Sequence, residues 1–248
     1  MRIAVVSDIH ANLTALEAVV ADLRRQGTDL IVQGGDVVGG GSRPAEVIDL
    51  VRELRWPGVY GNTDEMLWRP ERLSRALQAP QLQRFRDAML TEIIPATCRA
   101  IGDERLEWLK ALPGQWALRP GSGQAAQDLA VVHASPDDRW RSPLANASNE
   151  ELEQTFGPLA CRRVVFGHIH QPFVRHLPAL TIVNSGSVSL SYDGDPRAAY
   201  ALLDDDGVVI RRVEYDIEEE IARLAAARDP YAEWTAQVLR TGRYVPLP

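Results

Sequence analysis

Short motifs rich in Asp and His recur along this chain, each at the end of an apolar run. The first is D-x-H at Asp8 and His10, which follows five apolar or small residues at 3–7. Carboxylate, amide and imidazole groups are ligands of transition-metal ions. Taken alone, this pair could equally be a helix cap and a loop residue. The same pattern recurs, however, at Asp36, Asn62, His133, His168 and His170.

The placement of the histidines favours a shared metal site. Four of the five come directly after apolar runs, whereas His176 lies within a predicted strand and is interpreted as structural. A single histidine at such a position is usually a satisfied core residue or a strand-end cap. Core packing or strand capping does not explain why residues of metal-ligand type recur at five strand ends.

The apolar runs before these motifs are typical of buried strands. They lie at residues 3–7, 29–33, 58–60, 128–132 and 162–166. Apolar residues at helical spacing follow the first two runs, between Asn12 and Gly27 and from Pro44 to Leu54. This alternation predicts right-handed crossovers and a parallel sheet. Since such sheets bind ligands at the carboxyl ends of their strands, we expect the polar residues to converge there.

Residues 65–112 replace this alternation with helical segments rich in arginine, which we interpret as a helical insertion beside the site. Its arginines form either a solvated face, with Trp68 in the core, or a lid over the substrate. Strands at 116–118 and 128–132 flank a Gly-rich loop at 120–123. A short helix is predicted around residues 149–156.

The last third of the chain contains further short strands separated by turns. Residues 173–177, 180–184, 198–203 and 208–215 predict a meander that forms a second sheet packed on the first. The tail from about 216 to 248 has helical spacing. We expect the acidic run at 218–220 to favour the helix dipole and solubility.

Composition sets limits on architecture and partners. A chain of 248 residues with 45% hydrophobic content can bury a large core, so we expect one domain over 1–248. Without an apolar run of about 18 residues or a signal-peptide pattern, we expect a cytoplasmic protein that does not bind membranes. We expect Cys98 and Cys161 to be reduced thiols, because they are far apart in the sequence and form no disulfide framework. The net charge of −7 opposes binding of long nucleic acid, and no pattern indicates an oligomeric state.

In order and spacing, the motifs resemble those of the calcineurin-like metallophosphoesterase family. The matching segments are D-x-H at 8–10, G-D at 35–36, G-N-x-D at 61–64, His133 and G-H-x-H at 167–170. VNSGSV at 183–188 and DPRAAYALLD at 195–204 are similar to a bacterial and archaeal branch that includes small phosphodiesterases and diadenosine tetraphosphatases. The resemblance covers residues 1 to about 190.

The resemblance implies an α/β fold, a four-layer αββα sandwich of two mixed β-sheets flanked by helices, with a binuclear metal centre. The ligands implied for one ion are Asp8, His10, Asp36 and His170. Those implied for the other are Asp36, Asn62, His133 and His168, with Asp36 as the bridge. A metal-bridging hydroxide held at Asp36 would be the nucleophile. We expect two divalent transition-metal ions, manganese first, with iron, zinc or nickel as alternatives.

One departure from the family pattern bears on the substrate. Members often have a histidine after the asparagine of G-N-x-D, whereas this chain has Thr63, which cannot protonate a leaving group near neutral pH. Asp64 is a weak candidate for that acid, and its alternative role is to order the loop. We therefore expect nucleotide phosphoanhydrides of the dinucleoside polyphosphate type, or small phosphodiesters, because a leaving phosphate has a second pKa of about 6.

Two other functions are weighed against this one. A protein-binding scaffold without turnover is opposed by the complete set of ligand types, and a nuclease is opposed by the acidic charge and Thr63. Candidate substrate contacts are Asn12, Asn62, Arg139, Arg141 and Ser187, with a base stacked on Trp140. The alternatives are that Asn12 caps a helix and that residues 139–141 form an exposed loop with one buried Trp.

Overall fold

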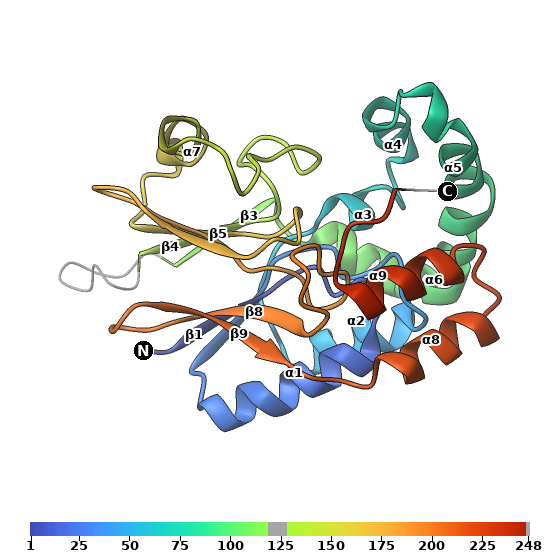
Figure 1. Ribbon diagram of the computed structural model, residues 1–248, viewed down its shortest axis with the longest axis horizontal. Coiled ribbons are helices and arrows are strands. Elements are labelled where there is room, and N and C mark those ends of the chain that lie inside the picture. Colours follow the sequence, from blue (N-terminus) through green and yellow to red (C-terminus); the bar gives the residue numbers. More distant parts are fainter. Residues whose placement is uncertain (119–127, 247–248) are drawn as a thin grey trace.

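The structure is a computed structural model that describes residues 1–118 and 128–246. It contains two mixed β-sheets that face one another (Figure 1). In spatial order, the first sheet consists of β2 (Leu30–Gln33), β1 (Ile3–Val6), β8 (Ala198–Leu203) and β9 (Val208–Val213). The second consists of β3 (Gln115–Leu118), β4 (Leu129–Val132), β5 (Arg163–Phe166), β7 (Thr181–Asn184) and β6 (Phe173–His176).

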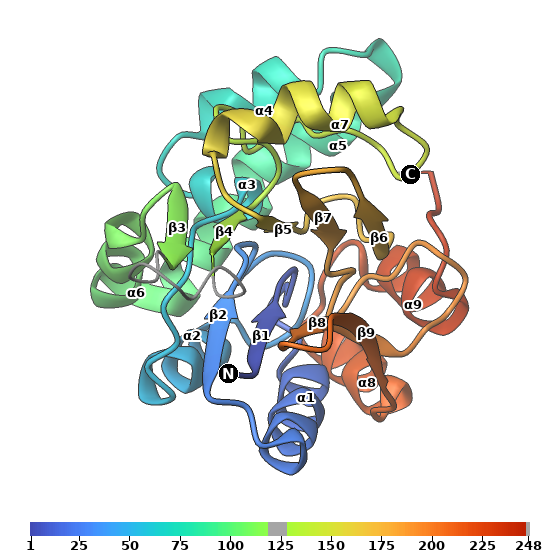
Figure 2. The ribbon, with the colours of Figure 1, turned by 90° about the vertical axis from the view of Figure 1, so that its left-hand side faces the viewer.

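Helices cover the outer face of each sheet. The first sheet is covered by α1 (Leu13–Gln26) and α2 (Pro44–Glu53), and the second by α7 (Asn149–Phe156) (Figure 2). Buried apolar residues of the insertion join the core cluster on the helix side of the first sheet. The C-terminal part forms α8 (Ile217–Ala226) and α9 (Ala232–Thr241). These layers confirm the expected α/β sandwich of two mixed sheets flanked by helices.

The insertion at residues 65–112 is helical, as predicted. It follows the single turn α3 (Asn62–Glu65) and contains α4 (Pro70–Ala76), the 3₁₀ turn η1 (Pro80–Leu82), α5 (Gln83–Ala88), the π-helical turn η2 (Met89–Ile93) and α6 (Ile94–Ala111). A further 3₁₀ turn, η4 (Gly157–Leu159), follows α7. The predicted Gly-rich loop at 120–123 lies outside the described residues.

Strand β1 shows why the apolar runs are continuous rather than alternating. Ala4 and Val6 pack toward the helices, while Ile3 and Val5 pack toward the second sheet, and all four are buried. Because successive side chains point to opposite faces, a strand in the middle of four layers needs apolar residues at every position.

Helix α1 confirms its predicted limits. The Asn12 side chain accepts a hydrogen bond from the Ala15 N–H at 2.9 Å, which caps the first turn. Gly27 ends the helix in the left-handed conformation, with φ of 62°.

The predicted meander is wrong in its partition between sheets. Strands β6 and β7 form a hairpin in the second sheet, where β7 pairs in parallel with β5. Strands β8 and β9 form a hairpin in the first sheet, where β8 pairs antiparallel with β1. Turn residues identify each hairpin, but the choice of sheet depends on pairings between distant segments. Residues 58–60 also fall short of a strand, since only Gly58 forms a single parallel bridge, to Gln33.

The acidic run at 218–220 is only partly solvated, so the solubility interpretation is wrong for Glu220. Its side chain is fully buried. It accepts hydrogen bonds from the Ser42 N–H at 2.9 Å and the Thr14 hydroxyl at 3.1 Å, and Arg43 lies 3.5 Å away. This carboxylate therefore fastens α8 to α1 and to the segment before α2.

A second buried carboxylate, Glu65, joins the insertion to the loop after β4. It accepts a hydrogen bond from Trp140 Nε1 at 2.7 Å and forms ion pairs with Arg69 and Arg72. Trp68 lies edge-on to Tyr60 and packs against the core. Two of the insertion's arginines are thus engaged with a buried carboxylate rather than only with solvent.

Two remaining expectations concern the thiols and membranes. Cys98 and Cys161 are half-buried, and no disulfide joins them; burial raises the pKa of Cys98. Within residues 1–118 and 128–246, none of the helices combines the length and apolar character required to cross a bilayer.

Replacement of Glu220 by Ala is expected to destabilise the fold. It leaves the Ser42 N–H and Arg43 without their buried carboxylate partner, a loss of about 3 to 5 kcal/mol in the free energy of unfolding. Urea denaturation followed by circular dichroism measures this change. Glu219→Ala, which removes an exposed neighbour that pairs with Arg223, is the matched control and should unfold like the wild type. Equal stability of the two variants would contradict the anchoring role of Glu220.

Candidate metal centre

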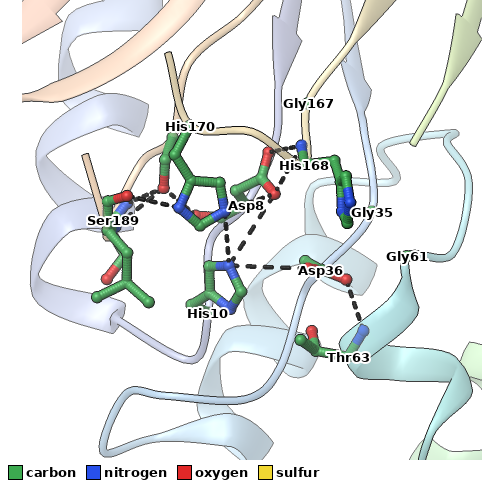
Figure 3. Close-up of polar contacts among 12 residues, drawn as sticks. Asp8, His10, Gly35, Asp36, Gly61, Thr63, Gly167, His168, His170 and Ser189 are labelled. Atoms are coloured by element: carbon green, nitrogen blue, oxygen red, sulfur yellow. Dashed lines mark hydrogen bonds and ion pairs between the residues drawn. The ribbon is translucent and has the colours of Figure 1, made fainter. Parts of the chain in front are cut away.

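The polar residues at the strand ends converge in one cluster, and Figure 3 shows Asp8, His10, Asp36, His168 and His170 side by side in it. Asp8 and His10 follow β1, and His170 follows β5. The Asp8 Oδ1 atom lies 3.1 Å from His170 Nε2, and the two Nε2 atoms of His10 and His170 lie 3.2 Å apart. Two imidazole nitrogens at this distance, with a carboxylate beside them, form one face of a metal-binding site.

Asp36 joins this group to a second one. Its Oδ2 atom lies 3.7 Å from His10 Nε2 and 3.4 Å from His133 Nε2. On the far side, the Asn62 Oδ1 atom lies 2.9 Å from His133 Nε2 and 2.8 Å from His168 Nδ1. The seven residues whose spacing suggested ligands are therefore contiguous in space.

Two sets of three residues have ligand atoms that all lie within 4.8 Å of one another. They are Asp8 with His10 and His170, and Asp8 with Asp36 and His133. Asp8 belongs to both sets, while Asp36 lies between His10 and His133. Both carboxylates are thus central to the cluster.

Backbone carbonyls orient three of the imidazoles. The Nδ1 atoms of His10, His133 and His170 lie 2.6, 3.0 and 2.5 Å from the carbonyl oxygens of Gly39, Gly34 and Leu190. A carbonyl can only accept, so each Nδ1 carries a proton and donates it. In the neutral form of each ring, Nε2 then carries the lone pair and faces the cluster, which is the arrangement that metal-binding histidines show.

The backbone turns sharply at these positions. Five of the seven residues have positive φ, between 51° and 68°: Asp8, His10, Asp36, His168 and His170. Asp and His enter this left-handed region more readily than most residues do. Strain of this kind is found at functional sites, where the surrounding structure holds it in place.

Glycines lie so close to the two carboxylates that no larger residue would fit at their positions. A Cβ atom on Gly61 would lie 2.0 Å from Asp36 Oδ1, and one on Gly167 would lie 2.1 Å from Asp8 Oδ2. The glycines of the G-N and G-H motifs are therefore required by close approach. Gly61 has φ of −103°, so conformational freedom is not the reason at that position.

The charges in the cluster are those of a cation-binding site. Burial opposes ionisation of Asp36, but the charges of His133 and His10 and the Thr63 N–H hold its pKa well below the usual range. Burial likewise opposes ionisation of Asp8, and His170 outweighs it and lowers the pKa. Two ionised carboxylates thus lie among imidazoles in a site shielded from water, and divalent transition-metal ions suit this donor set.

Comparison with known proteins agrees with this geometry. A family model, the calcineurin-like phosphoesterase superfamily domain, matches residues 1–207. The chain belongs to the calcineurin-like phosphoesterase superfamily. This confirms the family and the phosphoesterase class that the sequence motifs indicated.

Individual relatives match along nearly the whole chain. Uncharacterized protein MJ0912 of Methanocaldococcus jannaschii is 30% identical over 260 residues, which cover 97% of this chain and 98% of that protein. A metallophosphoesterase from Sphaerobacter thermophilus is 32% identical, with a TM-score of 0.76 over 98% of this chain and 100% of its own. Hypothetical protein PH1004 from Pyrococcus horikoshii OT3 is 20% identical, with a TM-score of 0.81 and coverage of 98% and 99%, and shares the fold.

Position 63, where calcineurin-like phosphoesterases often have histidine, is occupied by a threonine with internal partners. Its N–H donates to Asp36 Oδ1 at 2.8 Å, and its hydroxyl donates to the Val38 carbonyl at 2.6 Å. Thr63 therefore positions a candidate ligand and ties down the loop after β2.

Asp64 is fully buried, and both its carboxylate oxygens accept backbone N–H groups, from Val38 at 3.1 Å and Gly61 at 2.9 Å. Burial, followed by the charge of Asp36, raises its pKa to about 6. These contacts fit the loop-ordering alternative better than proton donation to a substrate.

The candidate substrate contacts Asn12 and Ser187 lie beneath the cluster. Asn12 caps α1 with its Oδ1 atom and donates from Nδ2 to the Ser189 hydroxyl at 3.1 Å. The Ser187 hydroxyl donates to the Asp8 carbonyl at 2.9 Å and accepts the Leu190 N–H. Both side chains support the backbone that carries ligands.

The loop at 139–141 is divided between packing and exposure. The Arg139 guanidinium lies over the Tyr60 ring, 4.7 Å from its centroid. Trp140 packs against the core and commits its indole N–H to Glu65, whereas Arg141 is exposed. No motif had indicated Tyr192, whose ring stacks on His170 at a centroid distance of 4.7 Å and an angle of 22°.

Metal binding is expected to strengthen with pH. Burial alone would lower the pKa of His133, but the Asp36 carboxylate outweighs burial and raises it to about 9. Burial and the charge of His133 lower the pKa of His168 to about 4. Below pH 9 a metal must therefore displace a proton from His133, while His168 is already neutral. Apparent affinity should rise by up to about tenfold per pH unit from pH 6.5 to 8.5.

Isothermal titration with Mn²⁺ in buffers of different ionisation enthalpy measures this displacement. We expect release of about one proton per protein molecule at pH 7 as the centre fills, because His133 is the group that must lose one. His133→Asn should abolish that release. A pH-independent affinity in the wild type would contradict the protonated state of His133.

Replacement of Gly61 by Ala is expected to empty the centre, because the added methyl overlaps Asp36 Oδ1. Elemental analysis after metal supplementation should show a loss of bound metal, on the order of tenfold or more in affinity. Gly157→Ala, where the nearest atom is 3.9 Å from the new Cβ, is the matched control and should bind metal normally. Full metal content in Gly61→Ala would contradict the close-approach requirement.

Proposed function

We propose that this protein is a two-metal phosphohydrolase acting on nucleotide phosphoanhydrides of the dinucleoside polyphosphate type, or on small phosphodiesters. The observation that carries the proposal is the single cluster of two carboxylates, one amide and four imidazoles, in which all members but the half-buried Asn62 and His168 are buried. Membership of the calcineurin-like phosphoesterase superfamily supports the reaction class.

The proposed ligand sets follow from adjacency in the cluster. Asp8, His10, Asp36 and His170 would hold one ion, and Asp36, Asn62, His133 and His168 would hold the other. Two divalent ions supply Lewis-acid activation of water and neutralise charge on the phosphoryl group. Manganese is the first expectation, with iron, zinc and nickel as alternatives. Within the chain, the carbonyls of Gly34, Gly39 and Leu190 orient three imidazoles so that their Nε2 atoms face the centre.

The substrate class is argued from the leaving group. Neither Thr63, whose hydroxyl is bound to the Val38 carbonyl, nor the buried Asp64 is placed to donate a proton. An alkoxide leaving from an unactivated diester needs that proton, whereas a nucleotide phosphate leaves without it near neutral pH. Anhydrides and activated esters are therefore favoured over DNA.

A substrate panel tests this proposal. Phosphomonoesters, diesters and dinucleoside polyphosphates would be assayed in parallel with manganese, zinc, nickel and iron, with Asp36→Asn as the inactive control. Dinucleoside polyphosphates should be hydrolysed fastest. Equal turnover of plasmid DNA would contradict the substrate class. Failure to retain any metal or to hydrolyse an activated aryl phosphate ester would instead favour a non-catalytic protein-binding scaffold.

Introduction of the missing histidine should change the substrate range. Thr63→His is expected to raise kcat for diesters with alkyl leaving groups by roughly 10²-fold, since a positioned general acid contributes about that much. Turnover of dinucleoside polyphosphates should change little. Thr63→Val removes the hydroxyl without adding an acid and serves as the control. An equal response of both substrates to Thr63→His would show that leaving-group protonation does not limit the reaction.

A further inference from the structure

Two tyrosines from the C-terminal third of the chain extend the metal cluster toward the surface. The Tyr192 ring stacks on His170, a residue of the cluster. Tyr244 meets Tyr192 edge to face, with 5.5 Å between centroids and an angle of 89° between planes. Tyr244 is 60% exposed. The three rings thus form a continuous row from the buried cluster to solvent.

The backbone on both sides of Tyr244 is anchored. The Gly194 N–H donates to the Gly242 carbonyl at 2.7 Å, and Trp234 Nε1 donates to the Val245 carbonyl at 3.0 Å. Gly242 has φ of 61° and packs so closely on Asp195 that a Cβ would lie 2.6 Å from its carbonyl carbon. In Figure 2 this segment, drawn in red, rises from α9 on the side of β6. The exposed ring is therefore presented by a fixed piece of chain.

The backbone of Tyr192 is also anchored by hydrogen bonds. The Tyr192 N–H donates to the His170 carbonyl at 3.1 Å, and the Gln171 side-chain amide donates to the Tyr192 carbonyl at 3.3 Å. The Tyr192 ring contacts His170 on one face and Tyr244 at its edge. Tyr192 therefore connects the exposed Tyr244 to a candidate metal ligand.

These features suit an aromatic ligand. A tyrosine with most of its surface in solvent contributes little to the core, and an anchored ring loses little conformational entropy when another ring stacks on it. The ring centroids of His170 and Tyr192 are 4.7 Å apart and those of Tyr192 and Tyr244 are 5.5 Å apart, so Tyr244 is within reach of the base of an extended nucleotide whose phosphate lies at the cluster. Stacking on such a ring is tolerant of base identity, because every base has a π-face.

We propose that Tyr244, supported by Tyr192, is a stacking platform for the nucleobase of a substrate whose phosphate lies at the metal cluster. This inference rests on the proposed function, which it deepens by assigning a base-binding residue. The platform makes nucleotides, rather than phosphate esters in general, the substrates that bind best.

Isothermal titration separates base binding from catalysis. The Mn²⁺-loaded full chain would be titrated with AMP and with ribose 5-phosphate, which has the same phosphate and sugar but no base. Tyr244→Ala should weaken AMP about tenfold, as expected for loss of one stacked base, and leave ribose 5-phosphate unchanged. Tyr244→Phe keeps the ring and should bind both as the wild type does. Val209→Ala, which truncates a comparably exposed residue at 58%, is the surface control.

Three results would overturn the platform: no preference of the wild type for AMP over ribose 5-phosphate, no loss of AMP affinity in Tyr244→Ala, or an equal loss for both ligands. A Tyr244-dependent preference for AMP in a protein that hydrolyses none of the substrate panel would support the platform and reject the proposed function. Hydrolysis of the panel without that preference would do the reverse. Thermal unfolding of each variant verifies that it is folded.

Discussion

Burial of two ionised carboxylates at the meeting point of two sheets is the constraint on which the rest of this structure depends. Asp8 and Asp36 are 0% and 2% exposed, in a place where an uncompensated charge would be costly. Imidazoles and backbone N–H groups surround them, and glycines make space for their oxygens. The turns after β1 and β2 run side by side, with the N–H groups of Asp8 and His10 donating to the carbonyls of Gly35 and Asp36. The sheets must therefore meet at one particular edge and register.

Segments distant in sequence hold this arrangement together. The chain that leaves β7 crosses from the second sheet to the first, and on the way Val188 and Ser189 donate to the carbonyls of Ser7 and Asp8. The same crossing segment provides the Leu190 carbonyl that orients His170. One stretch without regular structure thus supports both a carboxylate and an imidazole ligand. A protein in which this stretch shifted would lose more than one ligand at once.

The sequence indicated the candidate ligands more readily than their surroundings. Asp8, His10 and the other candidate ligands follow uninterrupted apolar runs, because strands buried on both faces tolerate polar residues only at their ends. The change from apolar to polar residues at the end of a run is visible within a few positions of the sequence. The partition of β6 to β9 between sheets is not local, since the same turn residues would close either hairpin. Glu220 resembled its exposed neighbours because its partners, Thr14 and Ser42, lie about 200 and 180 positions earlier. Tyr192 carried no motif, since its relation to His170 arises only from the fold.

The pairing of β1 with β8 has a consequence for synthesis of the protein. Ile3 lies opposite Leu203, so β1 and β2 are synthesised before β8, the partner of β1 that is made some 200 residues later. At elongation rates of about 5–20 residues per second, that interval lasts on the order of 10 to 40 seconds. Until then the apolar edge of β1 has no neighbour on that side. The first sheet therefore cannot be completed before β8 is made, and during that interval an unpaired strand edge is available for pairing with other chains.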